Sequence, residues 1–195
     1  MRIEYEAPPE YPVPVTSQYR LISIPPSHYC EKARWALELA ELPYREERHP
    51  PLFHRRAVKK AGGVSSTPVL VADDQVMPDS TDILIFIHQH PASAWRPYLG
   101  DSRLLAEAEE LEELFDTRLG PHTRRLAYFY LLQHPDLFLR SVLDGVGGME
   151  SRMFRIFRSP ISWLMRKGMN ITPSSADRSL NYVREAFAGV EERLS

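Results

Sequence analysis

The sequence contains little cysteine, almost no net charge and no long apolar run, and each shortage excludes a class of protein. Cys30 is the only cysteine among 195 residues, so the chain forms no internal disulfide. The 24 Lys and Arg residues balance 26 Asp and Glu residues, which leaves no basic footprint for nucleic acid. No stretch approaches the roughly 18 consecutive apolar residues of a membrane span, and the opening MRIEYEAPPE lacks a signal peptide's apolar run. We therefore expect a cytoplasmic protein without a membrane span or a nucleic-acid partner.

Metal and nucleotide sites are not indicated either. The seven histidines lack the spacing of metal ligands, and a zinc site would need a second cysteine. The glycine-rich segment GVGGME lacks the strand and helix that flank a nucleotide-binding loop. We expect no metal cofactor.

Residues 19–90 alternate between strand and helix patterns. A short strand, YRLISI, precedes a helix in which Cys30, Ala33 and Leu37 recur on one face, while charged residues such as Arg34 occupy the other. A second strand, LPYREERH, a shorter helix, LFHRRAVKKAG, and a hairpin within TPVLVADDQVMPDS follow. The helix DILIFIHQH completes the order β-α-β-α-β-β-α, which predicts an α/β domain with helices packed on a sheet.

From Ser102 onward the patterns are only helical. One long helix is predicted to end at Gly120, Pro121 to start the next, and Pro160 to interrupt a basic and apolar stretch. A last helix is expected from about Ser174. The predicted organisation is a Pro-rich arm (1–17), an α/β domain (18–92), a linker (93–101) and an all-helical domain (102–195).

Three motifs occur in this order, PPSHYCEKARWALELAELPY, STPVLV and PDSTDILIFI. Together with the element order, they resemble the glutathione transferase superfamily, close to its bacterial serine-type members. The resemblance implies a thioredoxin-like domain that binds glutathione as co-substrate, followed by a helical domain.

Ser27 corresponds to the position at which serine-type transferases hold the glutathione sulfur. A hydroxyl at a helix N-terminus favours a thiolate, and a helix cap alone would explain the same serine. Cys30 takes the resolving position of a Cys-x-x-Cys motif, and its place on the apolar stripe favours core packing over a mixed disulfide with glutathione.

The resemblance assigns the rest of the glutathione site to the other two motifs. Thr67 would offer its backbone to the cysteinyl part, before a cis Pro68. Asp79 and Ser80 would receive the γ-glutamyl group, although both also suit a helix cap. His54, or less well Arg55 or Lys59, would meet the glycyl carboxylate.

The resemblance also implies a pocket for the electrophile beside the helical domain. The aromatic residues expected to line it are Tyr29, Tyr128, Phe129, Phe154 and Trp163. The segment RMFRIFRSPISWLMRKG (152–168) has a second interpretation as a membrane-surface segment, although such a stretch more often packs its aromatic face inward.

The chain departs from the family near its end. SSADRSL, which contains Ser174 and Asp177, does not match the capping box that starts the central helix of the second domain. We therefore expect a helical domain that is incomplete relative to the family, with an apolar face left for a second copy or a partner.

Three functions follow. The first is a glutathione transferase that attacks a small hydrophobic electrophile, expected as a homodimer. The second is a thiol-disulfide oxidoreductase that uses Cys30. The third is a transferase-like module that binds without catalysis.

Overall fold

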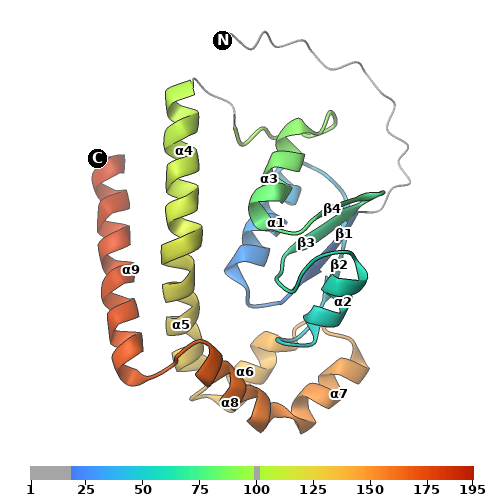
Figure 1. The fold of residues 1–195 in the computed structure, drawn as a ribbon, viewed down its shortest axis with the longest axis vertical. Coiled ribbons are helices and arrows are strands. Elements are labelled where there is room, and N and C mark those ends of the chain that lie inside the picture. Colours follow the sequence, from blue (N-terminus) through green and yellow to red (C-terminus); the bar gives the residue numbers. More distant parts are fainter. Residues whose placement is uncertain (1–18, 99–101) are drawn as a thin grey trace.

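The computed structural model describes residues 19–98 and 102–195 (Figure 1). The predicted Pro-rich arm (1–17) and the end of the predicted linker (99–101) lie outside the described residues. The first region contains β1 (Tyr19–Ser23), α1 (His28–Leu39), β2 (Tyr44–Arg48), α2 (His54–Lys60), β3 (Val69–Ala72), β4 (Gln75–Met77) and α3 (Ser80–Gln89). The second contains α4 (Ser102–Leu114), the π-helix η1 (Phe115–Leu119), α5 (Gly120–Leu131), α6 (Pro135–Val142), α7 (Gly148–Ile156), α8 (Arg158–Gly168) and α9 (Pro173–Leu194). This order confirms the predicted thioredoxin-like domain and the helical region after it.

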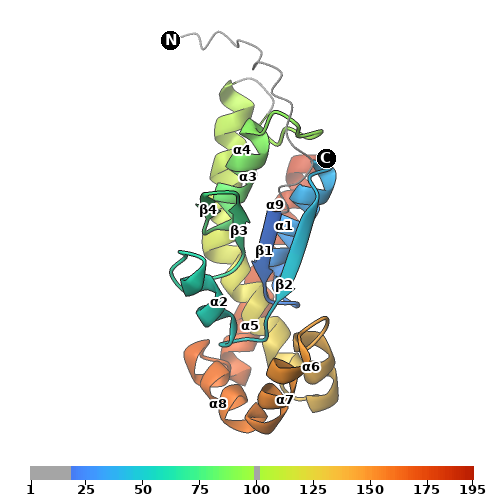
Figure 2. The ribbon, with the colours of Figure 1, turned by 90° about the vertical axis from the view of Figure 1, so that its right-hand side faces the viewer.

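The four strands form one mixed sheet in the order β2-β1-β3-β4 (Figure 2). β1 runs parallel to β2 and antiparallel to β3, and the β3–β4 pair is the predicted hairpin. Successive residues of a strand face opposite sides of the sheet. Leu21 accordingly packs with α1 and α3, whereas Ile22 packs with Val58 of α2. The sheet therefore separates two apolar layers.

The helical region has its own core. Phe138 of α6, Phe154 of α7 and Met165 of α8 meet Tyr128 of α5 there. Leu52 and Phe53, which precede α2, pack against this cluster from the first domain. None of the helices in the two described ranges is both long and apolar enough to cross a membrane.

The helix predicted to end at Gly120 continues through it, so that prediction is wrong. α4, η1 and α5 follow one another without a loop, and the amide of Gly120 donates to the carbonyl of Phe115, five residues earlier. A proline ring inside a regular α-helix would collide with the carbonyl four residues before it. The wider π-turn lets the chain pass Pro121 without breaking.

One smaller expectation also needs correction. Pro160 does not interrupt a helix: the break is at Phe157, and Pro160 lies in the first turn of α8, where a missing N–H costs little. A capping box is present at the start of α9. Thr172 Oγ1 accepts the amide of Ser175 at 3.2 Å, and Ser175 Oγ accepts the amide of Thr172 at 2.9 Å. This box is formed by Thr172 and Ser175, so the expected mismatch of SSADRSL with the family's capping box stays a prediction.

Candidate functional site

Ser27 lies where a tight turn after β1 leads into α1. Its backbone is extended, and its Oγ accepts the amide of Cys30 at 3.4 Å, which makes it the N-cap. The amide of Ser27 donates to the carbonyl of Ile24 at 3.1 Å and closes the turn around Pro25 and Pro26. A partly exposed hydroxyl therefore stands at the positive end of a helix, where a thiolate is favoured.

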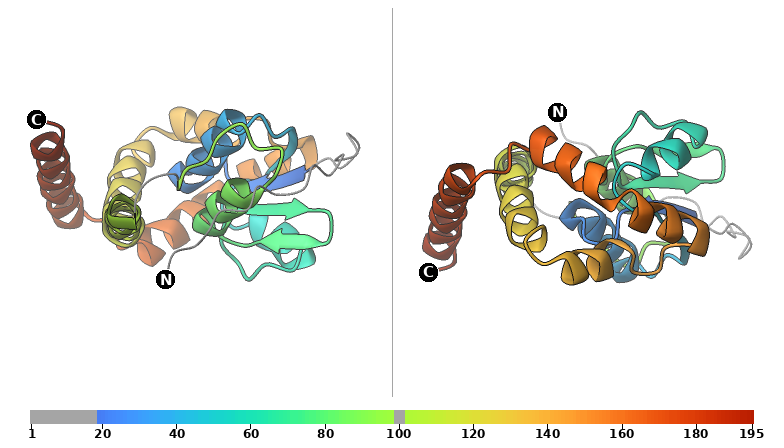
Figure 3. Two further views of the ribbon diagram at one scale, coloured as in Figure 1. Left: turned by 90° about the horizontal axis from the view of Figure 1, so that it is seen from above. Right: turned by 90° about the horizontal axis from the view of Figure 1, so that it is seen from below.

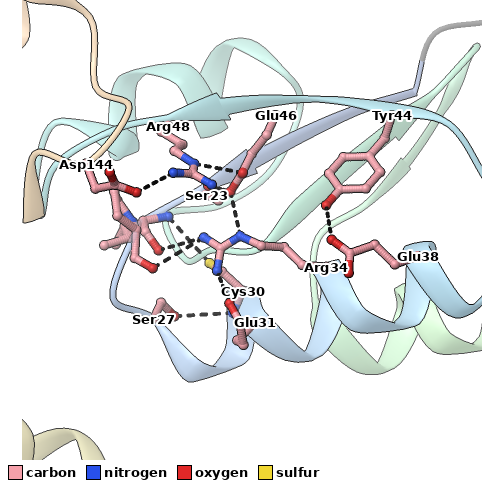
Figure 4. A network of polar contacts seen from close by, with 12 residues as sticks. Ser23, Ser27, Cys30, Glu31, Arg34, Glu38, Tyr44, Glu46, Arg48 and Asp144 are labelled. Atoms are coloured by element: carbon pink, nitrogen blue, oxygen red, sulfur yellow. Dashed lines mark hydrogen bonds and ion pairs between the residues drawn. The ribbon is translucent and has the colours of Figure 1, made fainter. Parts of the chain in front are cut away.

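Arg34 holds this turn from inside the protein (Figure 4). One guanidinium nitrogen donates to the carbonyls of Ile24 and Pro25 at 3.4 and 3.3 Å, and Nε donates to Glu46 Oε1 at 2.7 Å. The sequence pattern predicts Arg34 on the charged face of the helix, but Arg34 is buried. Its spacing of four residues from Cys30 could have identified it, because residues i and i+4 share a helix face.

Cys30 is fully buried, as its place on the apolar stripe predicts. Its Sγ accepts the amide of Ile24 at 3.4 Å. Burial raises the pKa of the thiol, and hydrogen bonds with Ser27, Ile24 and Thr67 oppose that rise only in part. A buried thiol with a raised pKa is a poor nucleophile.

The Thr67–Pro68 peptide bond is cis, as the resemblance implies, and β3 begins at the next residue. His54 contacts the same loop, because its Nε2 lies 3.1 Å from the carbonyl oxygen of Ser65. Burial lowers the pKa of His54, which favours the neutral ring. The structure thus places His54 as a buried support of the loop, and its predicted contact with a glycyl carboxylate stays a prediction.

Asp79 and Ser80 open α3. Asp79 is the N-cap, with Oδ1 accepting the amide of Thr81 at 2.9 Å. The side chain of Ser80 is buried, and among the described residues its Oγ has no hydrogen-bond partner. An unpaired hydroxyl at a helix N-terminus can donate a hydrogen bond to a carboxylate, and the free N–H groups of the helix can donate to the same carboxylate.

A polar cluster joins these helix ends to the second domain. Lys32 of α1 forms ion pairs with Glu112 of α4 and, at 3.0 Å, with Asp116 of η1. The hydroxyl of Thr81 donates to the same Glu112 at 2.6 Å. The starts of α1 and α3 are therefore fixed against α4 and η1.

The structure does not gather the predicted electrophile pocket in one place. Tyr29 lies at the interface with η1, where burial raises its pKa. Tyr128 is buried in the helical core, where burial raises its pKa to about 12, and Phe129 packs against that core. Trp163 is largely exposed on α8. Their shared role as pocket residues stays a prediction.

An open surface depression of about 400 Å³ instead lies beside the turn that leads to Ser27. Pro25 and Pro26 line one side of it, and Arg140, Ser141 and Asp144, from α6 and its C-terminal end, line the other. These residues were missed because α6 and the turn are more than a hundred residues apart in the sequence. Within residues 19–98 and 102–195, no three His, Cys, Asp or Glu side chains are grouped to hold a metal ion.

Residues 21–95 match the family model described as "Glutathione S-transferase, N-terminal domain". Within the chain, residues 21–95 therefore correspond to this N-terminal domain, and a helical C-terminal part follows it. None of the curated proteins matches the sequence.

Solved structures share the fold of about nine-tenths of this chain at low identity. The beta-etherase LigF from Sphingobium sp. strain SYK-6 aligns with a TM-score of 0.63 at 16% identity, over 90% of this chain and 72% of its own. Glutathione transferase GSTFuA3 from Phanerochaete chrysosporium aligns with a TM-score of 0.57 at 15% identity, over 90% of this chain and 72% of its own. The glutathione S-transferase CsGST83044 of Ceriporiopsis subvermispora was solved in complex with glutathione. It aligns with a TM-score of 0.51 at 17% identity, over 89% of this chain and 73% of its own. These likenesses establish a common fold.

Proposed function

We propose that the protein binds glutathione and transfers its thiolate to a small hydrophobic electrophile. The observation that carries the proposal is the position of the Ser27 hydroxyl at the N-terminus of α1, in one cluster with Cys30 and Thr67. Its oxygen accepts an amide of the helix, so its proton is available to a thiolate. The match of residues 21–95 to a glutathione transferase N-terminal domain supports glutathione as the thiol.

In this proposal the tripeptide lies across the starts of β3, α1 and α3. Thr67 offers backbone hydrogen bonds to the cysteinyl part, and Pro68 ends the loop that holds it. Asp79 faces the γ-glutamyl ammonium, while the Ser80 hydroxyl and the N-terminus of α3 receive the carboxylate. The thiol gives its proton to water, and the Ser27 hydroxyl donates a hydrogen bond to the thiolate. The sulfur then bonds to the electrophilic carbon, while the bond from that carbon to the leaving group breaks and the leaving group departs with the electron pair.

The electrophile would bind at the depression lined by Pro25 and Pro26, the two residues that directly precede Ser27 in the sequence. Arg140 and Asp144 make the wall on the side of α6 polar. In this proposal the second substrate binds between the two domains, on the side of the turn that precedes Ser27.

The test is conjugation of glutathione to a chlorodinitrobenzene. Ser27→Ala should lower kcat about tenfold or more while the affinity for glutathione changes little, because the hydroxyl acts on the thiolate. Ser27→Thr should restore much of the rate, and Ser195→Ala is the matched control at an exposed serine. Unchanged kcat in Ser27→Ala would exclude this role.

The alternative based on Cys30 receives no support from its surroundings, because the thiol is buried and its pKa is raised. A Cys30→Ala protein that lost deglutathionylating activity present in the parent would reverse that judgement.

A homodimer is part of the proposal. The apolar side chains of Leu104 and Leu114 on α4 and of Phe187 and Leu194 on α9 are exposed. α4 and α9 stand next to each other at one side of the molecule, joined near their ends by an ion pair between Arg193 and Glu107 (Figure 1). An exposed apolar face of this kind suits a second copy. Sedimentation of the parent and of Phe187→Ser would show whether this face associates.

A further inference from the structure

The two helices at one end of the molecule, α7 and α8, present apolar side chains to solvent. Seen from below, they lie on the near side of the molecule, with α2 beside them (Figure 3). The exposed members of this α7–α8 face are Met149, Met153, Ile156, Phe157, Trp163 and Leu164. Met149, Ile156 and Trp163 are 81%, 71% and 62% exposed. The sequence alone favoured inward packing of the aromatic side chains, but only Phe154 does so completely.

The same face is strongly basic. Residues 149–169 contain one acidic residue, Glu150. Its carboxylate forms a hydrogen bond with His49, whose Nδ1 lies 2.8 Å from Glu150 Oε2. The cations of this stretch are Arg152, Arg155, Arg158, Arg166 and Lys167. Neither Arg152 nor Arg155 has an ion-pair partner in the part of the chain that the structure describes. The whole chain is close to neutral, so the positive charge here is a local concentration.

A groove extends the α7–α8 face onto the first domain. It has a volume of about 700 Å³ and lies between α2 and α7. Arg55, Arg56 and Lys59 line it on the side of α2, opposite Met149, Met153 and the His49-bound Glu150 of α7. Exposed cations therefore border the apolar side chains on both sides.

This combination favours one kind of occupant. Nucleic acid would pair with the cations but would leave Ile156, Phe157 and Leu164 in water, because phosphates and sugars offer them no apolar partner. An anionic lipid bilayer satisfies both, since headgroups meet the cations while apolar side chains enter the acyl boundary. Trp163 has a suitable position: Lys167 Nζ lies 5.3 Å from its ring centroid, and tryptophan is enriched at membrane interfaces.

We propose that the α7–α8 face binds the surface of an anionic lipid bilayer, with α7 and α8 lying in the interface and the cations of α2 against the headgroups. The opposite side of α7 stays anchored by Phe154 in the helical core. The protein would attach peripherally, without a span, and the glutathione site would stay in water. The proposal does not rest on the transferase function.

The test is co-sedimentation with vesicles of phosphatidylcholine and phosphatidylserine, compared with vesicles of phosphatidylcholine alone. The full chain should sediment with the anionic vesicles, and binding should weaken as salt is added. The tryptophan emission should shift to shorter wavelength on binding, and Trp163→Phe should lose most of that shift.

Two variants separate the apolar and the charged contributions. Ile156→Ser with Trp163→Ser should lower the partition coefficient about tenfold or more. Arg152→Gln with Arg155→Gln should lower it roughly thirtyfold. The matched controls are Trp35→Ser, a tryptophan 64% exposed on α1, and Arg45→Gln with Arg118→Gln, two exposed arginines elsewhere. Circular dichroism checks that each variant folds.

Each other outcome would overturn the proposal. Equal binding to neutral vesicles would remove the role of charge, and an equal loss in the Trp35→Ser control would remove the role of this face. Binding to an oligonucleotide without binding to vesicles would assign the cations to nucleic acid. A dimer that dissociates in Ile156→Ser with Trp163→Ser, with no vesicle binding in the parent, would assign the face to a second copy.

Discussion

The hydroxyl of Tyr29 donates a hydrogen bond of 2.7 Å to the backbone carbonyl of Asp116, and so joins α1 to the π-turn of the second domain. The amide of Gly120 donates to Phe115, five residues earlier. In the same register, the carbonyl of Asp116 would accept from residue 121, which is a proline without an N–H. Tyr29 therefore supplies a donor that the helix itself lacks.

Tyr29→Phe should lower the free energy of unfolding by about 1–2 kcal/mol, because it leaves the carbonyl of Asp116 without this donor. Urea denaturation would measure the change. Tyr130→Phe is the control, since Tyr130 is an exposed tyrosine on α5. Equal stability of Tyr29→Phe and the parent would show that water replaces the phenol at no cost.

Gly120→Ala should destabilise the protein by roughly 1–3 kcal/mol through overpacking. A Cβ at residue 120 would lie 2.1 Å from the Tyr29 hydroxyl and 2.7 Å from its Cζ, so one of the two helices must shift. The cost should shrink when Tyr29→Ala is combined with it, because the clash is with that ring. A double-mutant cycle measures this coupling, and additive losses would contradict the contact.

Arg34→Met should lower stability by about 1–3 kcal/mol, because the largely buried carboxylate of Glu46 loses one of its two arginine partners and the turn before Ser27 loses its side-chain donor. Arg193→Met is the matched control. Its ion pair with Glu107 is exposed on both sides and should contribute less than about 1 kcal/mol. Similar losses of stability in the two variants would contradict the claim that the buried Arg34–Glu46 pair contributes more than the exposed Arg193–Glu107 pair.

Stability should fall as the pH drops below about 6.5. Burial lowers the pKa of His54 in the folded state, so the unfolded chain binds a proton first and is favoured as the solution becomes more acidic. Above about 6.5 the ring is neutral in both states and contributes no pH dependence. Urea midpoints in mildly acidic and neutral buffers should differ less in His54→Gln than in His134→Gln, an exposed histidine. Identical pH dependence in both variants would contradict the buried, neutral His54.

The first domain could be predicted almost completely from the sequence. Its strands and helices have clear periods, and residues such as Pro25, Gly62 and Asp79 mark their ends locally. The continuous helix at Gly120 could not be predicted, because the π-turn that accommodates Pro121 depends on contacts with α1. Arg34 was misplaced because its charge suggested solvent, whereas Glu46 and the turn carbonyls draw it inward.

In the candidate site, too, features set by the local sequence were predictable and features set by tertiary packing were not. Ser27, Thr67 and Ser80 stand in local motifs, so their positions at helix starts and before β3 were predictable. The aromatic residues assigned to the electrophile pocket come from segments whose packing sets which side faces inward. In the structure the side chain of Tyr128 lies in the helical core, whereas the side chain of Trp163 is exposed to solvent. Only the folded chain brings α6 to the turn before Ser27.

Calorimetric titration with glutathione tests the central claim most directly. The account predicts saturable binding of one glutathione per chain, weakened about tenfold in Ser80→Ala, which removes the unpaired hydroxyl at the start of α3, and unchanged in Ser195→Ala. A folded protein that binds no glutathione, or one whose affinity is the same in Ser80→Ala, would contradict it.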